Sequence, residues 1–132
     1  MMNEQTPYSS QPLATAVVLR PGIMQQSLRT ALATVPALVV VASLGDGLTA
    51  LNYVAAQPPA LLVIDCNLLD AEVEALIAAI KVRQLSTRCL VLTRSNLHSE
   101  RLLASGADAI VIHDSSQKEL AAVVARLHAG VL

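Results

Sequence analysis

Five short runs of mainly apolar residues recur along the chain, and they constrain its fold more than any other feature of the sequence. None of them alternates between apolar and polar residues, which is the pattern of a strand with one face in water. Continuous apolar runs of this length are typical of strands buried on both faces, as in a parallel sheet covered by helices. The runs occupy residues 15–19 (TAVVL), 38–42 (LVVVA), 60–64 (ALLVI), 88–92 (RCLVL) and 109–112 (AIVI).

The segments between these runs have the periodicity of helices. Apolar residues spaced three and four apart indicate helices at residues 23–35, 46–56, 70–84 and 97–104. Ser116 and Glu119 form a capping box that opens a last helix. The sequence therefore predicts an α/β fold, a doubly wound five-stranded parallel sheet with helices on both faces. Right-handed crossovers favour the flavodoxin-like strand order 2-1-3-4-5.

Length and composition indicate a single folded domain. The chain has 132 residues, of which 54% are hydrophobic and 14% charged, and this composition excludes a largely disordered protein. Residues 1–13 are rich in Gln, Ser and Pro, so we expect a disordered leader there and a domain at 14–132. The apolar runs are too short to cross a membrane, and the N-terminus lacks the pattern of a signal peptide. We therefore expect a cytoplasmic protein.

Charge and cysteine content exclude two further classes of partner. The net charge is −1 and Lys81 and Lys118 are the only lysines, so we expect no direct binding of nucleic acid. Cys66 and Cys89 form no CxxC pair and both lie in apolar surroundings. We interpret them as small buried hydrophobic residues rather than zinc ligands, and we expect no metal site built on them.

Ligand chemistry in a doubly wound sheet lies at the carboxyl ends of the strands. No nucleophile–base pair and no glycine-rich phosphate loop occurs in the sequence, and Gly45-Asp46-Gly47 is a turn signal, so we do not expect an enzyme. The acidic cluster of Asp70, Glu72 and Glu74 opens a predicted helix, where negative charge is favoured, and we interpret it as structural. The candidate site residues are those that follow the strands: Leu19, Arg20, Ser43, Asp65, Thr93 and His113.

Three motifs at the strand ends are more specific than the strand pattern: PPALLVIDCNLLD (58–70), LVLTRSN (90–96) and SGADAIVIHDSSQKEL (105–120). Together they resemble the receiver domain of two-component response regulators, over about residues 15–130. The resemblance implies that Asp65 stands at the phosphoacceptor position and that Thr93 contacts the phosphoryl group. It also implies that Gly106, Ala107 and Asp108 form the family's Gly-Ala-Asp signature before the fifth strand.

The same comparison shows where the sequence departs from the family pattern. Leu19 and Arg20 replace the acidic pair that holds magnesium in receivers, and His113 replaces a lysine after the fifth strand. Leu69 stands at a position that is usually Pro, and Ile110 at one that is usually aromatic. Magnesium is expected for the family, but its acidic ligands are missing here, so we expect no bound cofactor.

A cation at Arg20 changes the chemistry expected at Asp65. Magnesium prefers carboxylate and water oxygens, and a guanidinium at a ligand position repels it. Two unit charges about 4 Å apart interact by roughly 4 kcal/mol at an effective dielectric of 20, before desolvation is subtracted. We therefore hypothesise that Arg20 replaces the metal as the counter-ion of Asp65. The alternatives are that Arg20 points into solvent and that Asp65 caps a turn. His113, when protonated, could act for the missing lysine or lie in solvent.

Two functions follow from the resemblance. In the first, the chain is a receiver-type signalling domain that a sensor histidine kinase or another signalling protein addresses, with phosphorylation of Asp65 doubtful or independent of metal. In the second, it is a pseudo-receiver, a protein-protein interaction module that works without phosphorylation. Relatives commonly dimerise through the fourth helix, fifth strand and last helix, so a homodimer is possible there. The apolar candidates near that face are Leu97, Leu102, Leu103, Ile110 and Val131.

Overall fold

The computed structural model describes residues 12–20, 30–35, 37–65, 70–83, 86–93, 97–112 and 117–129. A short helical stretch at residues 30–33 lies within the helix predicted at 23–35, most of which falls outside the described residues. The strands are β1 (Leu13–Val18), β2 (Leu38–Leu44), β3 (Leu61–Ile64), β4 (Arg88–Thr93) and β5 (Ala109–Ile112), and the helices are α2 (Gly47–Ala56), α3 (Asp70–Val82), α4 (Ser99–Ser105) and α5 (Gln117–Ala129).

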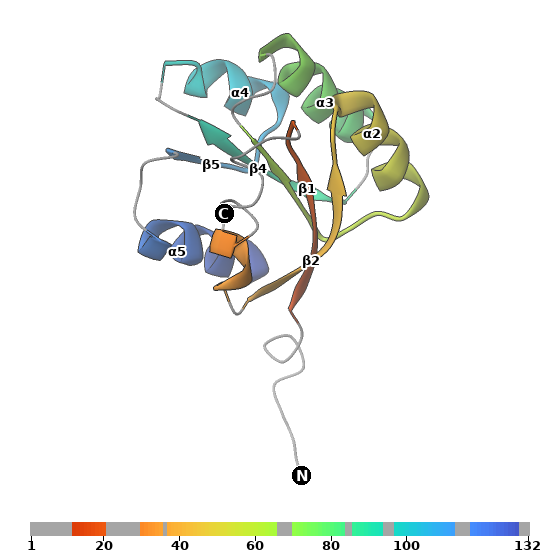
Figure 1. The fold of residues 1–132 in the computed structure, drawn as a ribbon. Helices are drawn as coiled ribbons and strands as arrows, with labels where there is room; N and C mark the ends of the chain where they lie inside the picture. Colours follow the sequence, from red (N-terminus) through yellow and green to blue (C-terminus); the bar gives the residue numbers. More distant parts are fainter. Residues whose placement is uncertain are drawn as a thin grey trace.

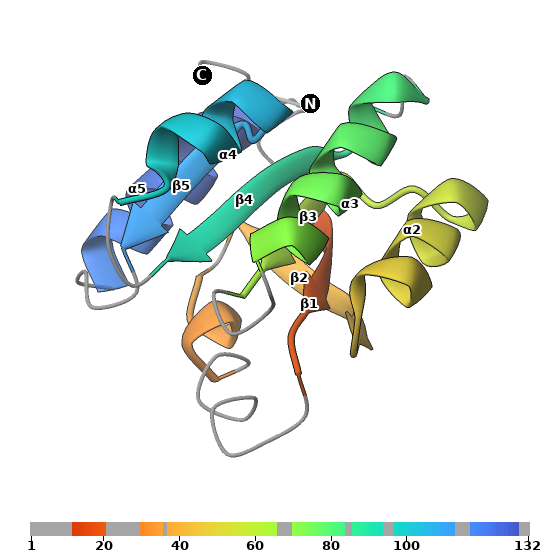
Figure 2. The ribbon, with the colours of Figure 1, turned by 90° about the horizontal axis from the view of Figure 1, so that it is seen from above.

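The five strands form one parallel sheet in the order β2-β1-β3-β4-β5, which confirms the predicted fold and strand order. Figure 1 shows α5 and the stretch at 30–33 on one side of the sheet, with α2, α3 and α4 on the other. The view from above in Figure 2 shows the twist of the sheet between the two helical layers. Residues at the carboxyl ends of β1, β3 and β4 therefore meet at one edge of the sheet.

The core has two halves because the side chains of each strand alternate between the two faces of the sheet. On the α5 side, Val17, Val63 and Leu90 pack with Leu120 and Val124. The other half joins strand residues to α2 and α3, through Val18, Ile64, Val54, Ile77 and Ile80. Both halves are built from aliphatic side chains, as the near absence of aromatic residues requires. No helix in the described part of the chain is long and apolar enough to span a membrane.

Hydrogen bonds, rather than apolar periodicity, decide where the elements begin and end. The ladder to β2 starts at Leu13, two residues before the predicted run. Asp46 is not the first residue of α2 but its N-cap, and its carboxylate accepts the backbone N–H of Thr49 at 2.7 Å. The predicted helix at 97–104 is shifted and ends at Gly106, which has a positive φ of 117°. The capping box predicted at Ser116 lies outside the described residues.

Candidate functional site

The candidate site lies at the carboxyl edge of the three central strands. Leu19 and Arg20 follow β1, Asp65 follows β3, and Thr93 is the last residue of β4. The backbone N–H of Asp65 donates to the carbonyl oxygen of Val18 at 2.9 Å, so the end of β3 is held beside the end of β1. Thr93 is half-buried and is in register with Ile112 of β5. The sequence prediction that these positions share one edge of the sheet agrees with this arrangement.

Asp65 is the only buried carboxylate among the described residues, with 3% of its surface exposed. Its backbone N–H is bonded, but its carboxylate makes no hydrogen bond or ion pair within the part of the chain that the structure describes. A buried carboxylate without a cation is costly unless water or another ligand reaches it. The side chain of Asp65 is therefore the least compensated charge of the described site.

Leu19 contributes to the core and not to the site. Its side chain is 1% exposed and belongs to the half of the core that faces α5. Its N–H donates to the carbonyl oxygen of Leu44 at 2.9 Å, which continues the ladder between β1 and β2 by one residue. An apolar side chain in this orientation offers no ligand atom to the edge where Asp65 lies.

Arg20 pairs with Glu72 of α3 and not with Asp65. Its Nη2 lies 3.8 Å from Oε1 of Glu72, and about half of the Arg20 side chain is exposed. The other oxygen of Glu72, Oε2, accepts the backbone N–H of Gly47 at 2.6 Å, which fixes the carboxylate near Arg20. The hypothesis that Arg20 is the counter-ion of Asp65 is therefore not met in this structure. Because the pair is long and solvent-exposed, it contributes only about 0–1 kcal/mol.

Sequence analysis interpreted Glu72 as structural but missed its partners, Arg20 and Gly47. Glu72 binds the first residue of α2 across a gap of 25 positions in the sequence, at a helix terminus where N–H groups lack intrahelical partners. A Cβ at Gly47 would lie 2.9 Å from Cγ of Glu72, so the close approach requires glycine there. Its position in the acidic first turn of α3 gave a structural interpretation, which the contact supports, but gave no partner.

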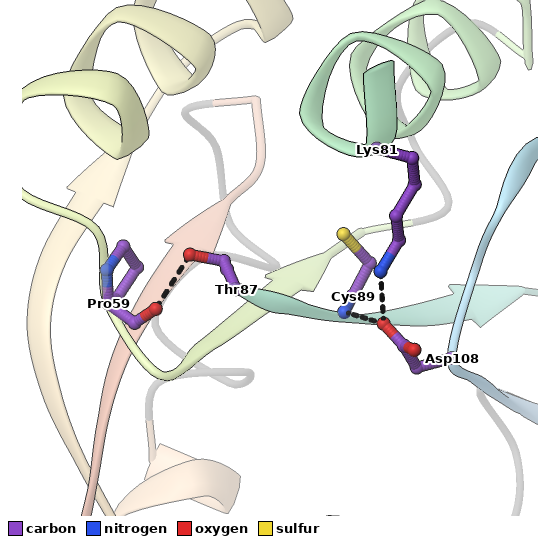
Figure 3. A network of polar contacts seen from close by, with 5 residues as sticks. All are labelled: Pro59, Lys81, Thr87, Cys89 and Asp108. Carbon is purple, nitrogen blue, oxygen red and sulfur yellow. Dashed lines mark hydrogen bonds and ion pairs between the residues drawn. The ribbon is translucent and has the colours of Figure 1, made fainter. Parts of the chain in front are cut away.

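A second polar network lies at the opposite, amino edge of the sheet, around Asp108 (Figure 3). Oδ2 of Asp108 accepts the backbone N–H of Cys89 at 2.7 Å and Nζ of Lys81 at 2.9 Å. The N–H of Asp108 donates in return to the carbonyl oxygen of Cys89 at 2.9 Å. Asp108 therefore joins the starts of β4 and β5 to the end of α3. Beside it, the hydroxyl of Thr87 donates to the carbonyl oxygen of Pro59 at 2.7 Å.

Gly106 and Cys89 complete the surroundings of Asp108. Gly106 ends α4 in a backbone conformation that favours glycine, and a Cβ there would lie 2.6 Å from Cγ of Lys81. Burial raises the pKa of the Cys89 thiol to about 12, because the thiolate is poorly solvated among apolar neighbours. Cys89 is buried, as predicted for a small hydrophobic residue, whereas Cys66 lies outside the described residues.

Comparison with known proteins places this arrangement of strands and helices. No family model and no curated protein matches the sequence. The signal receiver domain of NarL, a proposed response regulator from Mycobacterium tuberculosis, superposes with a TM-score of 0.80 at 21% identity, over 91% of this chain and 98% of that one. The chain has the fold of a response-regulator receiver domain.

Two further structures show the same receiver fold. The receiver domain of the sensor histidine kinase PA1611 from Pseudomonas aeruginosa, with magnesium coordinated in its active-site cleft, has a TM-score of 0.76 at 17% identity, over 90% of this chain and 99% of that one. The isolated receiver domain of RcsB from Salmonella enterica serovar Typhimurium, determined with the phosphomimetic BeF3−, has a TM-score of 0.76 at 20% identity, over 91% of each chain.

The described donors at this edge of the receiver fold do not fit a magnesium ion. Magnesium needs a near-octahedral set of oxygen ligands, usually with one or two carboxylates. Asp65 offers one carboxylate, Leu19 is turned into the core, and Arg20 brings a positive charge. Within the described residues, no three Asp, Glu, His or Cys side chains come close enough to hold a metal. His113 lies outside those residues.

Proposed function

We propose that this chain is a cytoplasmic receiver-type signalling domain in which magnesium-dependent phosphorylation of Asp65 has been lost. The observation that carries the proposal is that Arg20, after β1, pairs with Glu72, while the buried Asp65 belongs to no group of three possible metal ligands among the described residues. The partner would be a sensor histidine kinase or another signalling protein that reads the surface of the domain.

The position of Asp65 supports the receiver half of this proposal. It follows the central strand β3 at the carboxyl edge, and Thr93 ends the neighbouring strand β4. Phosphoryl transfer to a carboxylate brings anionic groups together, so it depends on a compensating cation. The receiver of PA1611 has magnesium coordinated in its active-site cleft. At the ends of β1 and β3 this chain has one carboxylate, a buried aliphatic side chain and an arginine.

The loss of magnesium dependence is tested by adding acetyl phosphate with and without magnesium and measuring the intact mass. We expect no phosphoryl adduct under either condition, and Asp65→Asn serves as the control for adducts elsewhere. BeF3− with magnesium should likewise leave the backbone amide NMR spectrum unchanged. An adduct on Asp65 that depends on magnesium would refute the proposal.

A gain-of-function variant sharpens the test. The Arg20 side chain is about half exposed, so Arg20→Asp adds a carboxylate without disturbing the core. We expect it to increase magnesium affinity measured by calorimetry, and Arg20→Ala, which removes only the cation, is the matched control. Leu19→Asp would place a charge in the core and so requires a circular dichroism check of folding. If Arg20→Asp gains no affinity, the missing acid is not what prevents binding.

A second candidate is the pseudo-receiver, a module that binds proteins through α4, β5 and α5. The observation in its favour is the exposure of two leucines. Leu97, just before α4, is 78% exposed, and Leu103, on α4, is 52% exposed. Leu102, an apolar candidate for the same face, is instead 5% exposed and packs in the half of the core that contains Ile77 and Ile80 of α3. Loss of partner binding on Leu103→Lys, with Asp65→Asn unchanged, would support this function over the first.

A further inference from the structure

The outer edge of β2 combines features that exposed sheet edges usually avoid. Among the described strands, β2 is at one end of the order and pairs with β1 alone. Its seven residues, Leu38–Leu44, contain no charged residue and no proline. Natural edge strands are commonly protected by charge, proline, a bulge or a covering segment, because a bare edge is a template for another strand.

The backbone of this edge is free to pair. In a parallel pair, the N–H and C=O groups of alternate residues point away from the partner strand. Between Val39 and Ser43, no backbone group forms a hydrogen bond beyond the pairing with β1 within the described part of the chain. An extended strand added at the edge satisfies such a row of donors and acceptors along its whole length.

Two apolar side chains of this strand are open to solvent. Val39 is 46% exposed and Val41 is 51% exposed. The ladder to β1 shifts register so that Val41 is an extra residue between Val40 and Ala42, and this bulge is the one protective feature among the described residues of the edge. It interrupts regular pairing but adds no charge. The opposite edge, β5, is only four residues long.

We propose that β2 pairs antiparallel with β2 of a second copy of this chain, centred on Val41, the middle residue of the strand. A second copy fits because an edge is complementary to itself under a two-fold axis. Because β2 has no charged residue, pairing two copies places no like charges opposite one another. The net charge of −1 also gives little repulsion between the copies.

This dimer differs geometrically from one formed through α4, β5 and α5. β5 is at the far end of the sheet from β2, so the α4 face would stay free. Antiparallel pairing also reverses the strand direction across the axis, so the edges that carry Asp65 would point in opposite directions in the joined sheet. The inference is independent of whether Asp65 is phosphorylated.

The oligomeric state of the full chain, followed by sedimentation velocity over a series of concentrations, tests the proposal. We expect a concentration-dependent dimer that Val41→Lys weakens by at least about tenfold, because it places like charges opposite one another. Val82→Lys is the matched control: Val82 is 81% exposed on α3, away from β2, and should leave the dimer intact. Hydrogen exchange should show concentration-dependent protection of residues 39–43.

A charge-swap experiment tests the pairing centred on Val41 directly. Val41→Lys and Val41→Glu should each be monomeric alone, and an equal mixture should form a heterodimer. Circular dichroism of each variant checks that it is folded, and Val39→Lys provides a second disruption at an exposed position. A wild-type monomer at the highest concentration, an intact Val41→Lys dimer or a monomeric mixture would each overturn the proposal. Loss of the dimer on Leu103→Lys instead would assign it to the α4 face.

Discussion

Replacing Asp108 with alanine tests the network that holds β4, β5 and α3 together at the amino edge of the sheet. The substitution removes the acceptor of two contacts, from the N–H of Cys89 at 2.7 Å and from Nζ of Lys81 at 2.9 Å. The other contacts of the fold are left in place. The resulting change in stability therefore measures what this carboxylate contributes to the native state.

The expected loss is worked from the two contacts. A hydrogen bond to a charged group contributes about 1.5–3 kcal/mol. The ion pair is partly exposed, with 34% of the Lys81 side chain and 22% of the Asp108 side chain accessible, so it adds only about 0.2–1 kcal/mol. Asp108→Ala should therefore lower the free energy of unfolding by about 2–4 kcal/mol. At about 3–5 °C per kcal/mol for a chain of this size, the melting temperature falls by about 6–20 °C.

Urea unfolding followed by far-ultraviolet circular dichroism measures this loss, since the chain has no tryptophan. Lys81→Met removes only the ion pair with Asp108. It should lower the free energy of unfolding by less than half as much as Asp108→Ala. Arg101→Ala is the control for an exposed pair: Arg101 Nη2 lies 3.0 Å from Oε2 of Glu74 with 64% of its side chain exposed, and its loss should cost at most about 1 kcal/mol. If Asp108→Ala costs no more than Arg101→Ala, the argument from the buried N–H is refuted.

Three further outcomes follow from particular residues. Gly106→Ala should destabilise the chain by about 1–3 kcal/mol in urea, because φ is +117° and the new methyl meets Lys81; an unchanged midpoint would contradict this. Cys89, with a pKa of about 12, should resist iodoacetamide at neutral pH in native protein and react in denaturant, as read by peptide mass. The pKa of Asp46 is lowered because its carboxylate accepts the N–H of Thr49, so its stabilisation is present above the unfolded pKa and is lost as pH falls through the folded pKa. Asp46→Asn should therefore flatten the acid side of a stability-versus-pH curve, and an unaltered slope would count against the cap.

The sequence was sufficient to predict the sheet because the burial of a strand determines which residues occur within that strand. Each central strand is covered on both faces, so its apolar run is continuous, and the helices between the runs keep their own period. The chain order of these elements then leaves few topologies. The same reasoning located Asp65 and Thr93 at strand ends, since the end of an apolar run can be read directly from its residues.

The partners of the polar side chains could not be predicted in this way. Two acidic residues, Asp65 and Glu72, are candidate partners of Arg20. Sequence analysis favoured Asp65, which follows β3, the strand that pairs with β1. Only the packing of α2 against α3 brings Glu72 beside Gly47 and so fixes a carboxylate where Arg20 can reach it. Sequence analysis gave Glu72 a local role at a helix start and Asp108 a place in a family motif, because nothing in their neighbouring residues indicates a partner about 25 positions away.

The sequence by itself therefore determined the α/β class, the strand order and the placing of one carboxylate at the carboxyl edge without an acidic pair beside it. Tertiary structure decided which charges meet, that Leu19 faces the core, and that Val39 and Val41 of the edge strand β2 are exposed. The physical reason is the distance along the chain over which each effect acts. Burial and periodicity act over a few residues and are written in local composition. An ion pair or an exposed edge depends on where distant elements come to rest.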